Sequence, residues 1–164
     1  MMKKVCIALQ LFLLVMFVSS CSTSKEARGY KKKIDGNWQL QTVVTEGIMG
    51  KIKAQVFNEA DFNCFVGSSW HFNSNNNLGS YTISKNGTEC DDLKRDIRWS
   101  VYEPTGAAKQ LQFKRLDTKL KEVDANSGGF RFTIIQADNN SMKLRSEFTF
   151  ENKPAAFIYN FVRI

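Results

Sequence analysis

Histidine is nearly absent from this 164-residue chain, which contains only His71. A Ser-His-Asp arrangement would need that side chain, and His-rich metal spacing is missing. The sequence also lacks a Gly-x-Ser-x-Gly elbow and a phosphate-cradling glycine loop. We therefore predict that the protein is not an enzyme, with no catalytic residues, metal site or cofactor, and that His71 is exposed and inert.

The sequence also lacks an excess of charge where a nucleic-acid-binding domain would need it. Although the formal net charge is +7, Lys3 and Lys4 lie before the first apolar run, and residues 21–33 alone account for +4. From Ile34 onward, 16 basic residues balance 15 acidic ones. A nearly neutral domain has no field to attract phosphate backbones, so we predict no nucleic-acid partner.

No apolar run is long enough to cross a bilayer as a helix. The longest, Val5–Val18, falls short of the roughly 18 residues needed. It follows Lys3 and Lys4 and ends just before Ser19-Ser20-Cys21, which is the layout of a bacterial lipoprotein signal peptide. We predict that residues 1–20 are cleaved and that Cys21 is acylated, with palmitate among the acyl chains. The alternative is ordinary secretion with cleavage nearby and Cys21 free.

Residues 21–33 are short, polar and basic, which predicts a flexible leash between the lipid anchor and the folded domain. Its lysines would rest on anionic headgroups, although plain solubility explains them equally well. The leash lacks the acidic run of some surface-exported lipoproteins. We therefore expect a protein attached to the outer membrane of the bacterial cell envelope, facing the periplasm.

Cysteine is scarce as well, with four residues in the chain. Cys6 would leave with the signal peptide and Cys21 would carry lipid, so Cys64 and Cys90 remain as an even pair in an oxidising compartment. We predict a disulfide between them. The weaker alternative is a metal site in which these cysteines join Glu89, Asp91, Asp92 or His71.

From Gly36 onward, residues alternate between apolar and polar in short runs separated by Gly, Asn, Asp and Ser clusters. This pattern is typical of antiparallel β-structure. It predicts eight strands, at 37–45, 69–72, 79–83, 96–102, 111–115, 130–135, 142–150 and 156–163. The strands are mostly joined as hairpins and rich in aromatic residues, so we predict an all-β fold, an up-and-down barrel whose closure leaves no edges.

A two-sheet sandwich, such as an adhesion module, remains the alternative to the barrel. The connection from Glu46 to Ser68 is too long for a hairpin and should cross one mouth of the barrel. Within it, Lys53–Ala60 could form a turn or two of helix, and residues 119–125 are a second helical candidate.

Gly36-Asn37-Trp38 at the first strand resembles the Gly-x-Trp signature of lipocalins, and Arg163 stands where that family's last strand supplies an arginine. The stretch Cys64–Tyr81 is similar to a segment of small lipocalin-like lipoproteins of Bacteroidota-type bacteria. The resemblance covers residues 34–164. It implies an eight-stranded, lipocalin-like barrel in which Trp38 and Arg163 close one end, although the long helix usual before the last strand is missing.

Parity predicts many inward residues, including Val44, and an eight-stranded barrel is just wide enough to be filled by side chains or to hold one small ligand. A cavity would have its floor near Trp38 and its mouth near residues 48–65 and Pro104. The candidate pocket residues are Trp70, Phe72, Trp99, Phe113, Phe132 and Tyr159.

Two functions remain open. In the first, the protein is a membrane-tethered lipoprotein that binds a small hydrophobic molecule, a lipid or fatty acid, in its barrel. In the second, it is an accessory envelope lipoprotein whose filled barrel presents its loops to a protein partner.

Overall fold

The computed structural model describes residues 24–50, 52–84, 90–123 and 128–164. The predicted signal peptide at 1–20 and the predicted lipid attachment site at Cys21 lie outside these residues. Within the described part of the chain, no helix combines the length and apolarity that crossing a bilayer requires.

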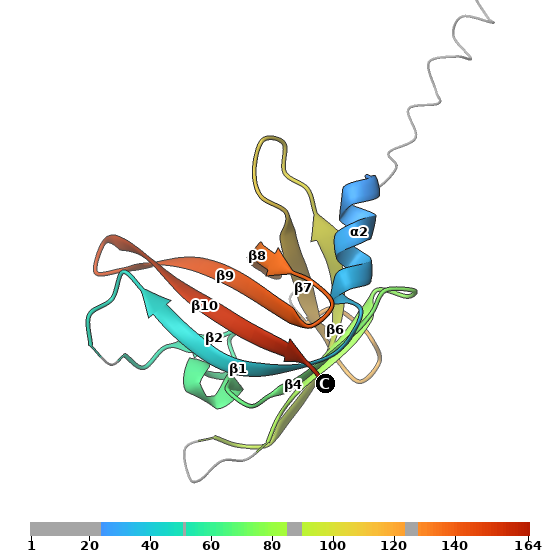
Figure 1. The fold of residues 1–164 in the computed structure, drawn as a ribbon. Helices are drawn as coiled ribbons and strands as arrows, with labels where there is room; N and C mark the ends of the chain where they lie inside the picture. The colour runs from blue at the N-terminus through green and yellow to red at the C-terminus, as the bar shows by residue number, and fades with distance from the viewer. Residues whose placement is uncertain (1–23, 51, 85–89, 124–127) are drawn as a thin grey trace, which may run out of the picture.

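Eight antiparallel strands close into a barrel in the order β1-β10-β9-β8-β7-β6-β5-β4 (Figure 1). Because β1 pairs with both β10 and β4, the sheet has no open edge, which confirms the predicted up-and-down barrel and excludes the sandwich. The strands are β1 (Gly36–Glu46), β4 (Ser69–Asn73), β5 (Leu78–Ile83), β6 (Leu93–Tyr102), β7 (Gln110–Leu116), β8 (Phe130–Ala137), β9 (Ser141–Phe150) and β10 (Lys153–Arg163).

Alternation along the strands fills the barrel with aromatic and aliphatic side chains, and Trp38, Trp70 and Trp99 are all buried. The predicted parity fails in β1, where a bulge between Leu40 and Thr42 shifts the register. One extra residue reverses the side-chain faces beyond it. Val44, predicted to point inward, is therefore 51% exposed, and Val43 packs against the core instead.

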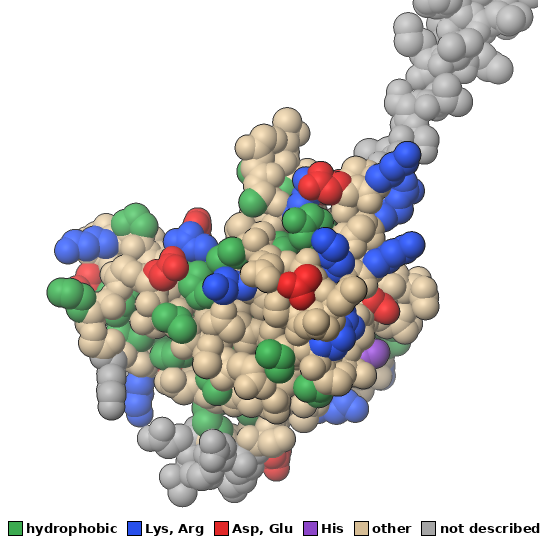
Figure 2. Space-filling model, viewed as in Figure 1, with side chains coloured by type: hydrophobic (Ala, Val, Ile, Leu, Met, Phe, Trp, Pro, Cys, Tyr) green, Lys and Arg blue, Asp and Glu red, His purple; other side chains and the backbone are tan. Residues whose placement is uncertain are grey.

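The segment predicted to be a flexible leash is instead largely helix α2 (Lys25–Ile34), so that prediction is wrong over residues 25–33. The hydroxyl of the N-cap Ser24 accepts a hydrogen bond from the Ala27 N–H at 3.0 Å. Ala27 and Ile34 are buried against the barrel, where α2 packs on β6 and β8. The carboxylate of Glu26 pairs with the Lys109 ammonium at 2.9 Å. The helix thus covers one mouth of the barrel. Figure 2 shows Lys and Arg side chains gathered around α2.

Arg163 and Trp38, the predicted closing pair, join α2 to the barrel. The guanidinium carbon lies 4.3 Å from the centroid of the Trp38 ring. Its Nη1 donates to the Asp35 carbonyl oxygen at 2.7 Å, its Nη2 to that of Lys33 at 2.6 Å, and its Nε to that of Asn139. Trp38 Nε1 donates to the Ile34 carbonyl oxygen at 2.7 Å. The two side chains therefore satisfy the carbonyl groups at the C-terminal end of α2.

The glycine of the Gly-x-Trp triplet is needed for this packing. Gly36 has a φ of 114°, a conformation that favours glycine, and a Cβ there would collide with the guanidinium of Arg163.

The opposite mouth is covered by the connection between β1 and β4, as the sequence predicts. The connection contains a small hairpin of β2 (Gln55–Val56) and β3 (Ala60–Asp61), followed by the 3-10 helix η1 (Phe62–Phe65). The helix considered for Lys53–Ala60 is therefore wrong, because Phe57 and Asn58 take positive φ values and turn the chain back.

The second helical candidate, residues 119–125, is also wrong over its described part. The Asp117 carboxylate accepts hydrogen bonds from the Lys119 and Lys121 N–H groups, and Leu120 has a positive φ. This tight turn lets Glu122 bridge back to Leu116.

A disulfide links Cys64 in η1 to Cys90 just before β6, with the sulfurs 2.10 Å apart. The predicted pairing is confirmed, and the alternative metal site is wrong because neither sulfur is a free thiolate. The bond fastens the mouth-covering connection to the barrel wall.

Removing this bond in a Cys64→Ala/Cys90→Ala variant should lower the free energy of unfolding by about 3 kcal/mol, because the bond closes a loop with a sequence separation of 26. Urea unfolding followed by tryptophan fluorescence measures the change. The wild type in reducing agent serves as the matched comparison and should lose a similar amount. Unchanged stability in both would contradict the stabilising role of the bond.

Arg163→Lys should lower the free energy of unfolding by about 2 kcal/mol, because an ammonium cannot reach all the carbonyl oxygens and stack flat on Trp38. Hydrogen exchange should also accelerate at the α2 amides. Arg131→Lys is the control, since Arg131 lies over the Tyr102 ring on the exposed surface. An equal loss in both variants would contradict a special role for Arg163.

Candidate functional site

At the mouth covered by the β1–β4 connection, the interior of the barrel is filled by one side chain from the loop of the β2–β3 hairpin. Phe57 is buried, and its ring centroid lies 5.0 Å from that of Phe65 and 5.2 Å from that of Phe113. Its ring also contacts Trp70, Phe132 and Tyr159, at centroid distances of 6.1, 5.6 and 6.2 Å. Four of the six predicted pocket residues are thus brought together, but around a side chain of the protein itself.

The other two predicted pocket residues, Phe72 and Trp99, pack against each other with centroids 5.2 Å apart. Both are buried, and Trp99 Nε1 donates to the Leu78 carbonyl oxygen at 3.0 Å. These two residues belong to the buried core and do not line the cavities at the mouth that the β1–β4 connection covers.

A cavity of about 640 Å³ opens beside Phe57, where β8 and β9 separate. The β8–β9 pairing runs only from Thr133↔Arg145 toward the α2 end, so the first residues of β8 and the last of β9 are not paired with each other. The cavity is lined by Ala54, Gln55, Val56, Phe57, Gly128, Gly129, Phe130, Arg131, Ser146, Glu147, Phe148, Phe157 and Tyr159.

Of the residues that line this cavity, only Tyr159 was predicted from the sequence as a pocket residue. Parity along the strands also predicts that Phe130, Phe148 and Phe157 point inward, but they are not among the candidate pocket residues. Ser146 is the signal that could have revealed the cavity, because it is a small polar residue at an inward position of β9. Its hydroxyl donates to the Tyr159 hydroxyl at 3.3 Å. Burial raises the pKa of Tyr159 to about 12, so this phenol stays neutral at physiological pH.

A second cavity, of about 600 Å³, lies at the same mouth between the end of β1 and the mouth-covering connection. It is lined by Val43, Thr45, Gly50, Ile52, Lys53, Phe62 and Asn63. The expected mouth near residues 48–65 is therefore correct. The loop around Pro104 is not part of it, because Glu103 and Lys109 pair beside the α2 helix at the other end.

Glu59, two residues after Phe57, connects the hairpin to side chains of the barrel strands. Its side chain is only 5% exposed. Arg95 Nε lies 2.5 Å and Arg115 Nη1 3.3 Å from Glu59 Oε1, and the Tyr81 hydroxyl donates to Oε2. Burial first, and then the hydrogen bond to Glu59, raises the pKa of Tyr81 far above its usual range. Tyr81 therefore remains a hydroxyl donor, and no sequence pattern indicated this cluster.

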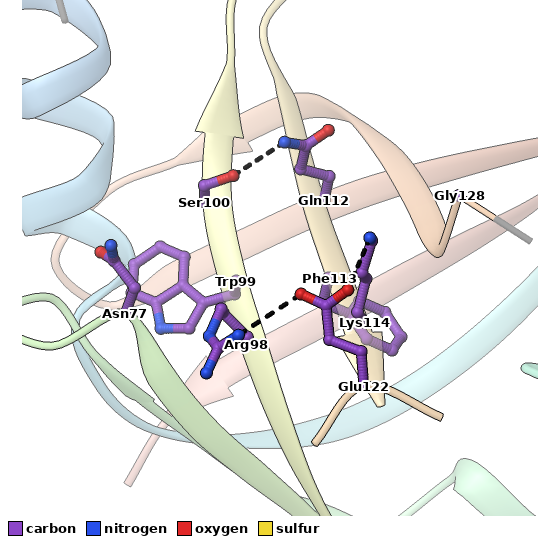
Figure 3. Close-up of a pocket in the computed structure, with 9 residues that line it drawn as sticks. All are labelled: Asn77, Arg98, Trp99, Ser100, Gln112, Phe113, Lys114, Glu122 and Gly128. Atoms are coloured by element: carbon purple, nitrogen blue, oxygen red, sulfur yellow. Dashed lines mark hydrogen bonds and ion pairs between the residues drawn. The ribbon is translucent and has the colours of Figure 1, made fainter. Parts of the chain in front are cut away.

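A third, smaller cavity of about 220 Å³ lies along β6 and β7. Figure 3 shows the residues that line it, which include the buried Trp99 and Phe113 as well as charged side chains. Arg98 and Lys114 both pair with Glu122, at 3.3 and 2.7 Å. The hydrogen bond from Lys114, assisted by the charge of Arg98, holds the pKa of Glu122 below its usual range. Gln112 Nε2 donates to Ser100 Oγ at 2.8 Å. Both cations already have Glu122 as a partner within the protein, which disfavours this cavity as a ligand site.

His71 is exposed, as predicted, and its Nδ1 lies 2.8 Å from Asn37 Oδ1. Among the described residues, no three His, Cys, Asp or Glu side chains gather closely enough to hold a metal ion.

The chain is similar to known proteins in both sequence and structure. Among solved structures, the chain is similar to a lipocalin-like protein from Bacteroides uniformis, with 10% sequence identity and a TM-score of 0.44 over 80% of this chain and 99% of that one. No curated protein matches the chain. A family model described as a lipocalin-like domain matches residues 34–144. Since that match covers more than half of the chain, the protein belongs to the family of lipocalin-like domains.

Proposed function

We propose that the protein is a lipoprotein, anchored to the outer membrane through acylated Cys21 and facing the periplasm, that binds a small hydrophobic molecule in the cavity beside Phe57. The ligand class is a lipid or fatty acid. The role is binding rather than catalysis, in keeping with a family whose members are typically non-enzymatic binding proteins.

The cavity between β8 and β9 carries this proposal. Its volume of about 640 Å³ falls within the range of about 300–1,000 Å³ typical of small-molecule sites. Phe57, Phe130, Phe148, Phe157 and Tyr159 give it an aromatic wall, and a few polar groups at its edge could orient a ligand. An apolar molecule would therefore gain burial without requiring the barrel itself to open.

The plug formed by Phe57 favours the second candidate function, an accessory lipoprotein whose filled barrel presents loops to an envelope protein. Seven aromatic rings surround Phe57, so the centre of the barrel at this mouth is occupied. The two candidates differ in whether the adjoining cavity takes a ligand.

The geometry of α2 supports the anchor. Only Ser22 and Thr23 separate Cys21 from the N-cap Ser24 of α2, so an acylated Cys21 would hold the helix close to the bilayer. The basic side chains of α2 would then meet anionic headgroups, each contributing about 1 kcal/mol near the surface.

Cys21→Ser should abolish acylation and release the protein from the membrane fraction, because stable anchoring requires the acyl chains. Labelling growing cells with a palmitate analogue, followed by membrane fractionation, tests this. Cys6→Ser is the matched control and should keep both the label and the membrane location. A labelled, membrane-bound Cys21→Ser variant would contradict the proposed anchor.

Native mass spectrometry of the full chain, purified gently from its own cells, should show a co-purifying apolar mass. Ser146→Trp should remove that mass because the indole would fill the cavity. Thr149→Trp should keep it, since Thr149 is exposed on the same strand. A wild-type protein that is always empty would favour the accessory role over the carrier role.

A further inference from the structure

The β2–β3 hairpin places an apolar ring and a carboxylate side by side inside the barrel. Phe57 fills the aromatic interior, and Glu59 puts its carboxylate among polar groups of the wall. An aromatic ring followed by a carboxylate has the two parts of an amphiphilic carboxylic acid, an apolar body and an anionic head.

The groups that hold this carboxylate belong to the barrel wall rather than to the hairpin. Tyr81, Arg95 and Arg115 come from the adjacent strands β5, β6 and β7, and Tyr81 and Arg95 are directly paired in register. The side chain of Arg115 is 11% exposed and that of Arg95 29%. Two partly buried guanidinium groups and a buried hydroxyl donor thus converge at one point. Such charge-assisted bonds are among the strongest a carboxylate can make.

The hairpin is the less firmly held part of this contact. Its strands have two residues each and pair only with each other, whereas the wall strands belong to the closed barrel. The described hydrogen bonds that close it are local, such as Ala54 N–H to the Asp61 carboxylate at 2.9 Å. Small elements with few pairings open at lower free energy than the body of a fold.

The cavity beside Phe57 supplies room next to the same cluster. Phe57 lines that cavity, and its ring also contacts the Tyr81 ring at a centroid distance of 6.3 Å. Withdrawal of the hairpin would therefore join the cavity to the arginine cluster in one space.

We infer that Tyr81, Arg95 and Arg115 form the head-group site for an amphiphilic carboxylate, and that Glu59 occupies this site until the ligand displaces the hairpin. This inference rests on the proposed ligand-binding function and names its ligand class. Glu59 and Phe57 act as an internal competitor. The apparent affinity for a ligand is therefore the intrinsic affinity multiplied by the fraction of molecules whose hairpin is displaced.

Calorimetric titration of the full chain with dodecanoate and with dodecan-1-ol tests the inference. Glu59→Gln should raise the affinity for dodecanoate about tenfold, because the competing charge is gone, and leave that for dodecanol little changed. Adding Arg115→Met to this variant should abolish the preference for the acid. Adding Lys94→Met instead is the matched control, since Lys94 is exposed on β6, and it should preserve the preference.

The outcomes separate the two proposals. Equal affinity of Glu59→Gln for acid and alcohol, or an acid preference that survives Arg115→Met, would overturn the inference while leaving the proposed hydrophobic site intact. Failure of every variant and of the wild type to bind either compound would overturn the proposed function itself.

A measurement on the unaltered protein avoids the risk that a variant does not fold. Saturating dodecanoate should accelerate hydrogen exchange at the amides of residues 54–61 in the wild type, and dodecanol should do so less. Unchanged or slower exchange in this segment with dodecanoate would overturn the displacement of the hairpin by the ligand.

Discussion

One guanidinium group joins the two ends of the domain and fixes helix α2 over one mouth of the barrel. Arg163, in the last strand, lies over the Trp38 ring of the first strand and donates to carbonyl oxygens of Lys33 and Asp35. A cation over an indole contributes roughly 0.5–2 kcal/mol, and each charged hydrogen bond about 1.5–3 kcal/mol. Since Trp38 also donates to the end of α2, loss of this contact would loosen both the helix and the β1–β10 seam. The Trp38–Arg163 pair therefore has a structural role and does not belong to the proposed ligand site.

The opposite mouth is built on a different principle, because a loop rather than a helix covers it. Its cover is fixed by the Cys64–Cys90 disulfide at one point and by the Glu59 carboxylate at another. The first link is covalent, whereas the second is the one that we propose a ligand carboxylate replaces. Under this proposal, the disulfide would keep the connection joined to the barrel while its hairpin moves. The aromatic interior would then be core when the hairpin is in place and the wall of the binding site when it is not.

The barrel could be predicted from sequence because its strands obey period two and their turns carry clear signals. Prediction failed where a tertiary contact overrode the local pattern. Val44 points outward because the bulge at Leu40/Thr42 reverses the parity, and no residue type marks that bulge. Helix α2 was not predicted, because the basic, polar composition of residues 21–33 favoured a flexible leash. The sequence nevertheless contains an N-cap residue, Ser24, and helical spacing of the apolar residues Ala27, Tyr30 and Ile34. The Glu59 cluster joins residues far apart in the chain, so only the folded barrel reveals it.

The proposed anchor and the proposed binding site constrain each other through the geometry of the barrel. If Cys21 is acylated as proposed, the lipid would hold the α2 mouth toward the bilayer, because only two residues separate Cys21 from Ser24. The β2–β3 hairpin lies at the mouth opposite α2 (Figure 1), and the cavity and the arginine cluster adjoin it. With the proposed anchor, this mouth would face away from the membrane. A ligand would accordingly enter from the aqueous side rather than from the leaflet that carries the anchor. An amphiphilic carboxylate suits this arrangement better than a wholly apolar lipid, since its head keeps it soluble during transfer and its tail gains the aromatic wall on arrival.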